Sequence, residues 1–272
     1  LNFANTGPLR ARRQIVTIHD ASVFAAPAGY STAFLVWYRY LHRRLSRSAL
    51  HIVTDSEFSR GELQKYCGLE FNRSAVIPLG AEHAYKMPAD ESILARHGLA
   101  PGRFVLAAGS LNPNKNLASL AQTARRLAER NISLVIAGGG NARVFQSASF
   151  DLPPSVRYLG YVTDEELRAL YQQACCFVFP SRYEGFGLPP LEAMACGCPV
   201  VVSRAASLPE VCGEAAVYVD PSNPMEIADA VIRVTENTAL RLSLQERGRA
   251  RAAKFRWADA AMRWFQLFGK FS

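Results

Sequence analysis

Short apolar runs alternate with amphipathic stretches along most of the chain. In the first third, β-branched and apolar runs predict strands over residues 14–20, 50–56 and 75–80. A helix is expected over 32–48, and another is expected after the capping residues Ser56 and Ser59. Beyond a Gly/Pro-rich break at 97–102 the pattern starts again and predicts strands over residues 103–110, 132–139, 156–162, 175–181, 198–204 and 215–220.

Two helices of this second series have clear signals. One is expected from Lys115 to about residue 130, because apolar side chains recur there at spacings of three and four. The other begins at Thr163, where TDEEL offers a capping residue and an acidic first turn. The strands are almost continuously apolar, which indicates parallel sheets covered by helices on both faces. We therefore expect an α/β protein with a partial Rossmann-like domain over 1–98 and a complete doubly wound domain over 99–250.

The composition fits an intracellular enzyme. Hydrophobic residues make up 49% of the 272 residues, which is enough for packed cores. No run approaches the roughly 20 apolar residues of a membrane span. The six cysteines lie mostly in apolar runs without a CxxC pair, so we expect buried free thiols rather than disulfides or a metal site.

The net charge of +8 is unevenly spread. The predicted helix 32–48 alone carries four arginines, at positions 39, 43, 44 and 47. Its basic, aromatic-bearing face is either an ordinary solvated surface or a surface that docks on anionic lipid or a phosphorylated acceptor. Nucleic-acid binding is the weakest of the alternatives, because no nucleic-acid motif accompanies the charge.

The segment 181–199 carries the clearest chemistry. Glu184 enters a loop with two glycines, Gly185 and Gly187, and a helix with Glu192 in its first turn follows. A strand, a glycine loop and a helix in this order point main-chain N–H groups at a site where a phosphate can bind. Carboxylates repel a phosphate but bind the vicinal hydroxyls of sugars. Together these features predict a nucleotide sugar as the ligand.

Other polar residues follow predicted strands at the same edge of the sheets, where ligands of such folds bind. A lysine at a helix start, here Lys115, is unfavourable by about 0.3–1 kcal/mol because of the helix dipole. It is either explained by an anion that binds there or is an exposed lysine that the position tolerates. Tyr161 and Val162 end a strand, where backbone groups could pair with a nucleobase or could simply close the strand. His19 and Asp20 end the first strand and face the crevice, although a lone histidine is more often structural than catalytic.

These segments resemble a known family. EGFGLPPLE, residues 184–192, resembles the E-x7-E motif of the retaining glycosyltransferases of family 4, the group 1 transferases. GSLNPNKNL, residues 109–117, is similar to that family's phosphate-binding turn, and TIHD, VTDSEFSR, VIPLG and SLPEVCGEAAVYVDP are patterned as in the family. The resemblance covers essentially the whole chain. It implies the GT-B architecture of two Rossmann-like domains, with residues 251–272 forming a helix that crosses back onto the N-terminal domain.

The resemblance also implies roles for individual residues. Glu184 and His19 would be the catalytic residues, both beside the donor sugar. Glu192 would bind the ribose diol, Lys115 the diphosphate and Val162 the base. The other donor-binding residues would be Ser110, Tyr161, Gly185, Phe186, Gly187 and Leu188. In this family the lysine neutralises the leaving diphosphate, so we expect no metal ion and no cofactor beyond the donor substrate.

Two departures from the family pattern bear on activity. Family members begin with a further strand and helix that include a glycine-rich loop, so we expect the N-terminal domain of this chain to be incomplete. Many members also carry an arginine shortly before the lysine, where this chain has Gly109, Ser110 and Leu111. Arg204 is one candidate to replace it.

The expected reaction is transfer of a hexose from a nucleotide diphosphate sugar to a saccharide or lipid-linked acceptor. The resemblance favours mannose on GDP or a UDP-hexose, and polysaccharide assembly in the cytoplasm or at the inner face of the membrane. A non-catalytic nucleotide-sugar-binding fragment is the alternative. A nicotinamide-dependent oxidoreductase is excluded, because G-F-G-L-P-P replaces G-x-G-x-x-G and lies far from the first strand.

Overall fold

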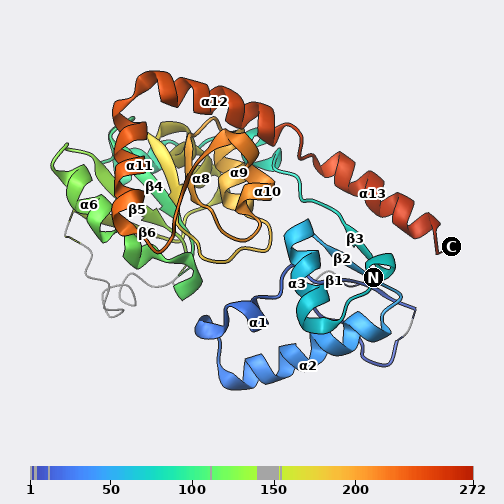
Figure 1. The fold of residues 1–272 in the computed structure, drawn as a ribbon. Coiled ribbons are helices and arrows are strands. Elements are labelled where there is room, and N and C mark those ends of the chain that lie inside the picture. Colours follow the sequence, from blue (N-terminus) through green and yellow to red (C-terminus); the bar gives the residue numbers. More distant parts are fainter. Residues whose placement is uncertain are drawn as a thin grey trace.

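The computed structural model describes residues 2, 5–11, 13–110, 112–139, 153 and 155–271 and is an α/β protein with two parallel sheets (Figure 1). Within this described part, the smaller sheet has the order β1-β2-β3 and the larger one β6-β5-β4-β7-β8-β9. The strands of the smaller sheet are β1 Ile15–Thr17, β2 His51–Thr54 and β3 Ser74–Val76. The strands of the larger sheet are β4 Phe104–Ala108, β5 Ser133–Ala137, β6 Val156–Gly160, β7 Cys176–Phe179, β8 Val200–Ser203 and β9 Ala216–Val219.

Helices cover both faces of the larger sheet, and its strands β4, β7 and β8 are completely buried, whereas the edge strand β6 is only partly buried and carries the exposed Arg157. Phe104 and Leu106 of β4 belong to one core, and Val105 and Ala107, which point the other way, belong to a second core. The first core includes side chains of α8 Asp164–Gln173, α9 Leu188–Ala195 and α10 Leu208–Cys212. The second includes side chains of α6 Ala121–Ala128, α11 Pro224–Glu236 and α12 Thr238–Ala252.

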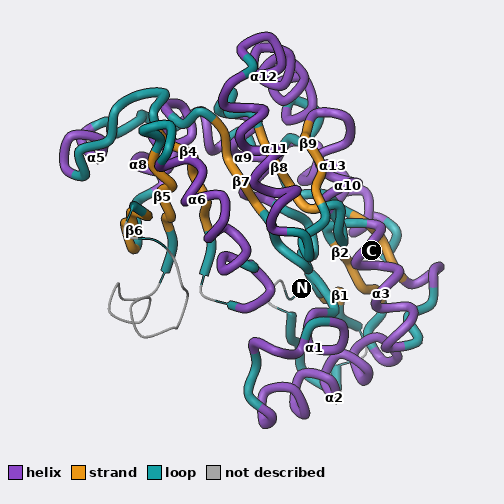
Figure 2. The backbone as a smooth tube through the Cα atoms, turned by 60° about the vertical axis from the view of Figure 1, so that its left-hand side comes forward, coloured by secondary structure: helices purple, strands orange, loops and turns teal. Residues whose placement is uncertain are grey.

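The order of the larger sheet determines where a ligand can bind. Figure 2 shows β4 and β7 side by side in the middle of this sheet, as their pairing requires. From β4 the chain continues outward to β5 and β6, whereas from β7 it continues outward in the opposite direction to β8 and β9. The loops that follow β4 and β7 therefore separate at a topological switch point, where open parallel sheets bind their ligands.

The smaller sheet is also covered on two sides. One core joins β1 and β2 to α2 Thr32–Ser48 and α3 Glu57–Cys67. On the other side lies α13 Trp257–Gly269, whose Ala260 and Leu267 are buried with Ile15, Val53 and Ile77. Figure 1 shows α13, in red, running from the larger unit across to the smaller one.

Short elements connect these parts. The remaining α-helices of the described chain are α1 Ser22–Ala25, α4 His83–Lys86 and α5 Ser92–Arg96. The 3₁₀ turns are Pro27–Gly29, Phe71–Arg73, Pro113–Lys115, Leu117–Leu120 and Gly213–Ala215. No helix of the described part is both long and apolar enough to cross a membrane. All six cysteines are buried and free, as predicted.

Most elements lie where the sequence predicts them, but the predicted start of one helix, at Lys115, is wrong. Two 3₁₀ turns occupy residues 113–120, and α6 begins only at Ala121. Asn116 interrupts the helix: its φ is +56°, and its side-chain amide donates to the carbonyls of Pro180 and Pro221. Lys115 thus ends a 3₁₀ turn, and the helix-dipole argument does not apply to it. The helix at Thr163 is confirmed, including the capping box with Glu166.

Candidate active site

The loops after β4 and β7 meet at the switch point of the larger sheet. Lys115 from the first loop and Glu184 from the second form an ion pair, with Nζ 2.7 Å from Oε1. The ammonium group also lies 5.3 Å from the centre of the Phe179 ring. Both side chains are mostly buried, at 24% and 12% exposure. Two residues that the sequence assigned to one ligand are therefore in direct contact, although 69 positions separate them.

The glycine loop that follows Glu184 presents unused hydrogen-bond donors. Gly185, Phe186 and Gly187 are buried, yet no acceptor in the described part of the chain receives their main-chain N–H groups. Buried N–H groups nearly always have a partner in a folded protein. Gly187 has φ of +100°, a conformation that other residues rarely adopt. The Ser207 hydroxyl lies 2.9 Å and 2.8 Å from the carbonyls of Glu184 and Phe186, and these contacts hold the loop in its conformation. The loop has the features of an anion site.

The smaller unit packs directly against this loop. The hydroxyls of Ser56 and Ser59, at the start of α3, donate to the Gly185 carbonyl at 2.5 and 2.9 Å. The Glu210 carboxylate of the larger unit accepts the N–H groups of Glu57 and Phe58 at 2.8 and 3.0 Å. A carboxylate is favourable at the N-terminus of a helix. These four bonds join the two units at the edge of the site.

His19 reaches the same place from the end of β1. Its Nδ1 is 2.6 Å from Oδ2 of Asp55, which follows the neighbouring strand β2. Asp55 is almost completely buried, whereas the His19 side chain is 39% exposed. A Cβ atom on Gly185 would lie 2.6 Å from the His19 carbonyl, so the two backbones touch. A cavity of about 250 Å³ lies beside the pair. Its lining is mostly aliphatic, with Thr17, His19 and Asp55 on its polar side and the aromatic rings of Trp257 and Trp264.

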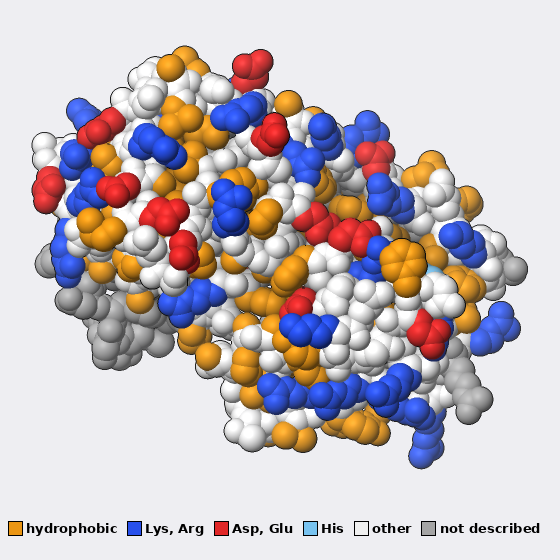
Figure 3. Space-filling model, in the orientation of Figure 1, with side chains coloured by type: hydrophobic (Ala, Val, Ile, Leu, Met, Phe, Trp, Pro, Cys, Tyr) orange, Lys and Arg blue, Asp and Glu red, His pale blue; other side chains and the backbone are white. Residues whose placement is uncertain are grey.

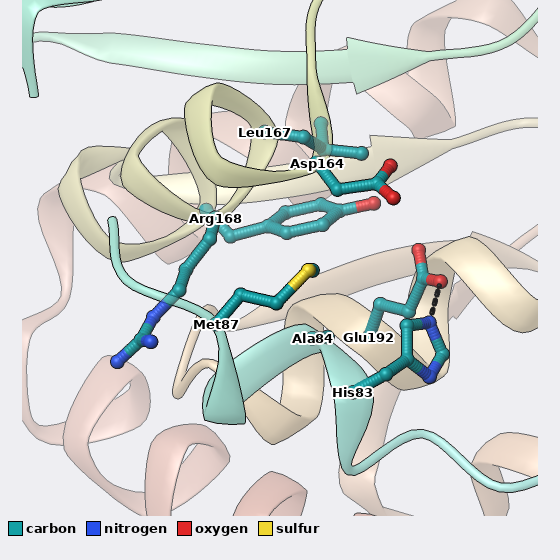
Figure 4. Close-up of a pocket in the computed structure, with 8 residues that line it drawn as sticks. His83, Ala84, Met87, Asp164, Leu167, Arg168 and Glu192 are labelled. Atoms are coloured by element: carbon teal, nitrogen blue, oxygen red, sulfur yellow. Dashed lines mark hydrogen bonds and ion pairs between the residues drawn. The ribbon is translucent and has the colours of Figure 1, made fainter. Parts of the chain in front are cut away.

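Glu192 lies in α9, one turn into the helix, and does not meet Lys115. Its Oε1 is 2.8 Å from Nε2 of His83, and the side chain is 14% exposed. Burial raises the pKa of Glu192, and the hydrogen bond from His83 opposes that shift. Figure 4 shows the carboxylates of Glu192 and Asp164 directed into one small cavity, with Met87 on its other side. The sequence interpretation gave His83 no role, and no spacing signal links it to Glu192, which is 109 positions away.

The remaining predicted residues line the edges of this region. Ser110 is exposed after β4, and its hydroxyl accepts the Asn112 N–H at 3.5 Å. Tyr161 is 82% exposed, whereas Val162 is half-buried against the core of the larger unit. Leu188 is half-buried at the start of α9. Arg204, the candidate for the missing arginine, places its guanidinium over the Tyr218 ring instead. The predicted site thus divides into a group around Lys115, Glu184 and His19 and a second group around Glu192.

Comparison with known proteins identifies the family. The model of the family "Glycosyl transferases group 1" matches residues 91–251. The O-antigen chain mannosyltransferase B of Escherichia coli is 36% identical over 264 residues, which are 93% of this chain and 69% of that protein. The serotype-specific mannosyltransferase WbdA of the same species is 33% identical, and the match covers 69% of this chain but only 23% of that longer protein.

Solved structures show the same fold. Sucrose-phosphate synthase from Thermosynechococcus elongatus superposes with a TM-score of 0.80 at 23% identity, over 94% of this chain and 67% of that one. The Anabaena protein HepE, solved in complex with UDP and glucose, gives a TM-score of 0.75 at 20% identity, over 96% of this chain and 71% of its own. The chain therefore belongs to the group 1 glycosyltransferases, with an α/β fold of the GT-B type.

Proposed function

We propose that this protein is a retaining glycosyltransferase that moves a hexose from a nucleotide diphosphate sugar to a saccharide or lipid-linked acceptor. The observation that carries the proposal is the glycine loop, whose three buried N–H groups have no acceptor in the described part of the chain. The three groups directly follow Glu184, the partner of Lys115, and the backbone of Gly185 touches that of His19. An anionic ligand with a sugar attached would satisfy all of them.

In this arrangement the donor diphosphate binds to the loop N–H groups and to Lys115, next to the exposed Ser110. Glu184, which pairs with Lys115 in this structure, accepts hydrogen bonds from the donor sugar once the lysine turns to the phosphates. The ion pair keeps both charges compensated before the donor arrives, since an unpaired buried charge is costly.

The nucleoside extends from the diphosphate towards α8 and α9. Glu192 binds the ribose diol, and the backbone at Tyr161 and Val162 contacts the base. Asp164, the first residue of α8, shares a cavity with Glu192, which supports placing ribose and base next to each other (Figure 4). Leu188 lies at the start of the helix that carries Glu192 and contributes an apolar contact.

Catalysis then depends on position and on stabilising the leaving diphosphate. Lys115 and the loop N–H groups stabilise the negative charge that develops when the bond to the sugar breaks, and no metal ion is needed for that step. His19, oriented by Asp55, lies beside the reacting carbon. Since retention is proposed and no protein nucleophile is assigned, the acceptor oxygen bonds to the sugar carbon on the face that the diphosphate leaves. The proton of the acceptor hydroxyl passes to an oxygen of the leaving diphosphate. The cavity beside His19 and Asp55, with its two tryptophans, suits a saccharide acceptor.

We assign residues 1–98 to the acceptor side, 99–250 to the donor side and 251–272 to the returning helix. The named activity of the Escherichia coli relative supports mannose as the transferred sugar. The complex named for HepE supports a UDP-hexose as the second choice of donor.

The outer face of α2 suits a membrane surface. Its solvent side carries Val36, Trp37 and Tyr40, each at least half exposed, and four arginines lie on the same helix. Figure 3 shows a row of basic side chains over α2 along the lower edge of the molecule, with hydrophobic side chains beside it. In the described part of the chain none of the four arginines pairs with a carboxylate, and Arg39 and Arg43 donate to the carbonyls of Val23 and Tyr66. Exposed aromatic groups next to arginines match the interface of an anionic lipid bilayer, where a lipid-linked acceptor would be found.

Vesicle sedimentation tests this surface. Arg44→Gln with Arg47→Gln should weaken binding to vesicles of anionic phospholipid about 30-fold, since each basic residue contributes about 1 kcal/mol near such a surface. The exposed Lys86 and Lys254 provide a control, because Lys86→Gln with Lys254→Gln removes the same charge outside α2. An equal loss of vesicle affinity in the two double variants would show that binding depends only on the net charge of the protein and not on α2.

A transfer assay tests the activity. The chain is incubated with radiolabelled GDP-mannose or UDP-glucose and a lipid-linked saccharide, with and without EDTA. We expect radiolabel to be transferred to the acceptor, and the amount transferred to be the same with and without EDTA. Donor binding without transfer would contradict the transferase assignment and leave the alternative of a nucleotide-sugar-binding protein.

A further inference from the structure

Outside the glycine loop, one histidine connects three separate segments of the chain. His83 is the first residue of α4, in the connection that leaves β3. Its Nε2 is 2.8 Å from Oε1 of Glu192 in α9. Its Nδ1 is 3.1 Å from the indole nitrogen of Trp257, the first residue of α13. A side chain of the connection therefore links the C-terminal helix to one of the two acids of the site.

The chemistry of the partners fixes the direction of these two hydrogen bonds. An indole N–H can only donate, so Nδ1 of His83 must accept. A neutral imidazole then carries its proton on Nε2. An ionised carboxylate can only accept, and Nε2–H therefore donates to Glu192. Trp257 selects the tautomer of His83 that has a proton to offer to the carboxylate.

Trp257 is itself held tightly by the residues that precede His83. Both carboxylate oxygens of Glu82 accept the main-chain N–H of Trp257, at 3.0 and 2.9 Å, at the N-terminus of α13. At Gly80 an added Cβ would lie 2.3 Å from that same nitrogen, so the backbone of the connection passes directly over the start of the helix. The imidazole and indole rings are 6.0 Å apart. The donor to His83 is thus fixed in place.

Glu192 needs such support because of where it lies. Burial favours the protonated form of this carboxyl and raises its pKa, and His83 is the first of the groups that counteract the shift. Figure 4 shows the imidazole beside the carboxylate at the rim of the cavity that Asp164 also faces. A hydrogen bond to an ionised group is about twice as strong as one between neutral groups.

We propose that His83 is a positioning residue, oriented by Trp257, that holds the Glu192 carboxylate in place and aimed at the vicinal hydroxyls of the donor ribose. The assignment rests on the proposed function, in which Glu192 binds the ribose. His83 acts through Glu192 and does not touch the reacting atoms. Its loss should therefore weaken donor binding and leave turnover at saturating donor nearly unchanged.

Nucleotide titration of the full chain tests the assignment. The probes are GDP and UDP, and the 2′,3′-dideoxy form of whichever one the wild-type protein binds. His83→Ala should weaken binding of the ribonucleotide about tenfold, as expected for a lost hydrogen bond to a charged group, but should barely affect the dideoxy nucleotide. His83→Gln should restore most of the affinity, because its amide can donate to Glu192. Trp257→Phe, which removes only the indole donor, should fall between the wild type and His83→Ala.

Controls and kinetics separate positioning from folding. His97 lies at the end of α5, outside the site, and His97→Ala should leave both affinities unchanged. In the transfer assay, His83→Ala should raise the donor KM with kcat within about twofold of the wild type. If His83→Ala lost the same affinity for the ribonucleotide and for the dideoxynucleotide, and His83→Gln did not recover it, the assignment would be overturned. A wild-type protein that binds neither GDP nor UDP would instead overturn the proposed function itself.

Discussion

The two glutamates of the site are buried against different partners, and these partners suit different tasks. Glu184 faces an ammonium group, so its charge is compensated by a formal opposite charge 2.7 Å away. Glu192 lies in a buried surrounding that raises its pKa, and the hydrogen bond from His83 opposes that shift. An acid that exchanges partners with a lysine suits contact with the reacting sugar. An acid held by a positioned histidine suits recognition of a diol.

Replacement of Glu184 should affect turnover more than binding. Glu184→Gln keeps the shape of the side chain but removes the charge that we expect to contact the sugar most strongly in the transition state. Loss of one such electrostatic contact typically lowers kcat by about 100-fold. Measurements of kcat and of the donor Kd for this variant separate the effect on turnover from the effect on donor binding. A rise in Kd as large as the fall in kcat would contradict the catalytic role.

The raised pKa of Glu192 has a consequence for stability. Because the folded state favours the protonated carboxyl, Glu192 contributes most to the free energy of unfolding below its ordinary pKa of 4.5. That contribution is lost as the pH rises through the raised pKa of the folded protein. Glu192→Gln stays neutral, so its Tm relative to the wild type should increase between pH 4.5 and neutrality, while donor binding weakens. Parallel Tm profiles for the two proteins over this range would contradict the shift.

At the scale of the elements, the β7–α9 loop has to lie directly against the end of β1. This contact is possible only with glycine at position 185, where a Cβ would lie 2.6 Å from the His19 carbonyl and 2.7 Å from Cβ of Asp20. The obstacle is partly backbone, which cannot rotate away. The loop can therefore reach the smaller unit only through a residue without a side chain.

Gly185→Ala should destabilise the protein by about 1–3 kcal/mol, the usual cost of an overpacked site. Gly61→Ala is the matched control, because Gly61 is exposed in the middle of α3 and no atom lies within 4 Å of an added Cβ. That change should stabilise the protein by about 0.5–1 kcal/mol, since alanine is the better helix former. Urea unfolding of both variants measures the difference. Similar effects of the same sign would refute the close contact.

The elements show which parts of the structure the sequence could predict. Apolar runs located all the strands of the described chain, and the TDEEL signal located the start of α8, because these are local properties. The break at Asn116 was missed, because it depends on carbonyls of Pro180 and Pro221, far away in the sequence. For the same reason the His83–Glu192 contact had no local signal. Motif resemblance brought Lys115 and Glu184 to one site, but not into an ion pair.

At the scale of the whole molecule, several contacts of the described chain join the two units, and two of them stand out. The start of α3 binds the glycine loop and Glu210, and α13 crosses over and packs on the smaller sheet (Figure 1). The two-sheet fold was predictable from the pattern of strands and helices. The polar contacts of α3 with the larger unit could not be predicted in this way. They are made by single polar groups whose partners lie more than 120 positions away in the sequence.

The contact between Glu210 and α3 can be tested by hydrogen exchange. Glu210→Ala removes the acceptor of the Glu57 and Phe58 N–H groups, so these two amides should exchange about tenfold faster, as expected for a lost bond to a charged group. Glu214→Ala is the control, because Glu214 lies close by in the chain and its carboxylate does not bind α3 in the described structure. The Ile77 amide, which bonds to Thr54 within the smaller unit, should be unaffected by either change. Unchanged exchange at both helix amides would argue against this contact in solution.

Calorimetric titration with nucleoside diphosphates tests the central claim, that the glycine loop and Lys115 form the donor site. The wild-type chain should bind either GDP or UDP saturably, and Lys115→Ala should bind it at least about tenfold more weakly, because a charged contact to phosphate is lost. Lys86→Ala, which removes an exposed lysine of α4, should bind as the wild type does. Absence of binding by the wild type, or equal affinity in Lys115→Ala, would contradict the account.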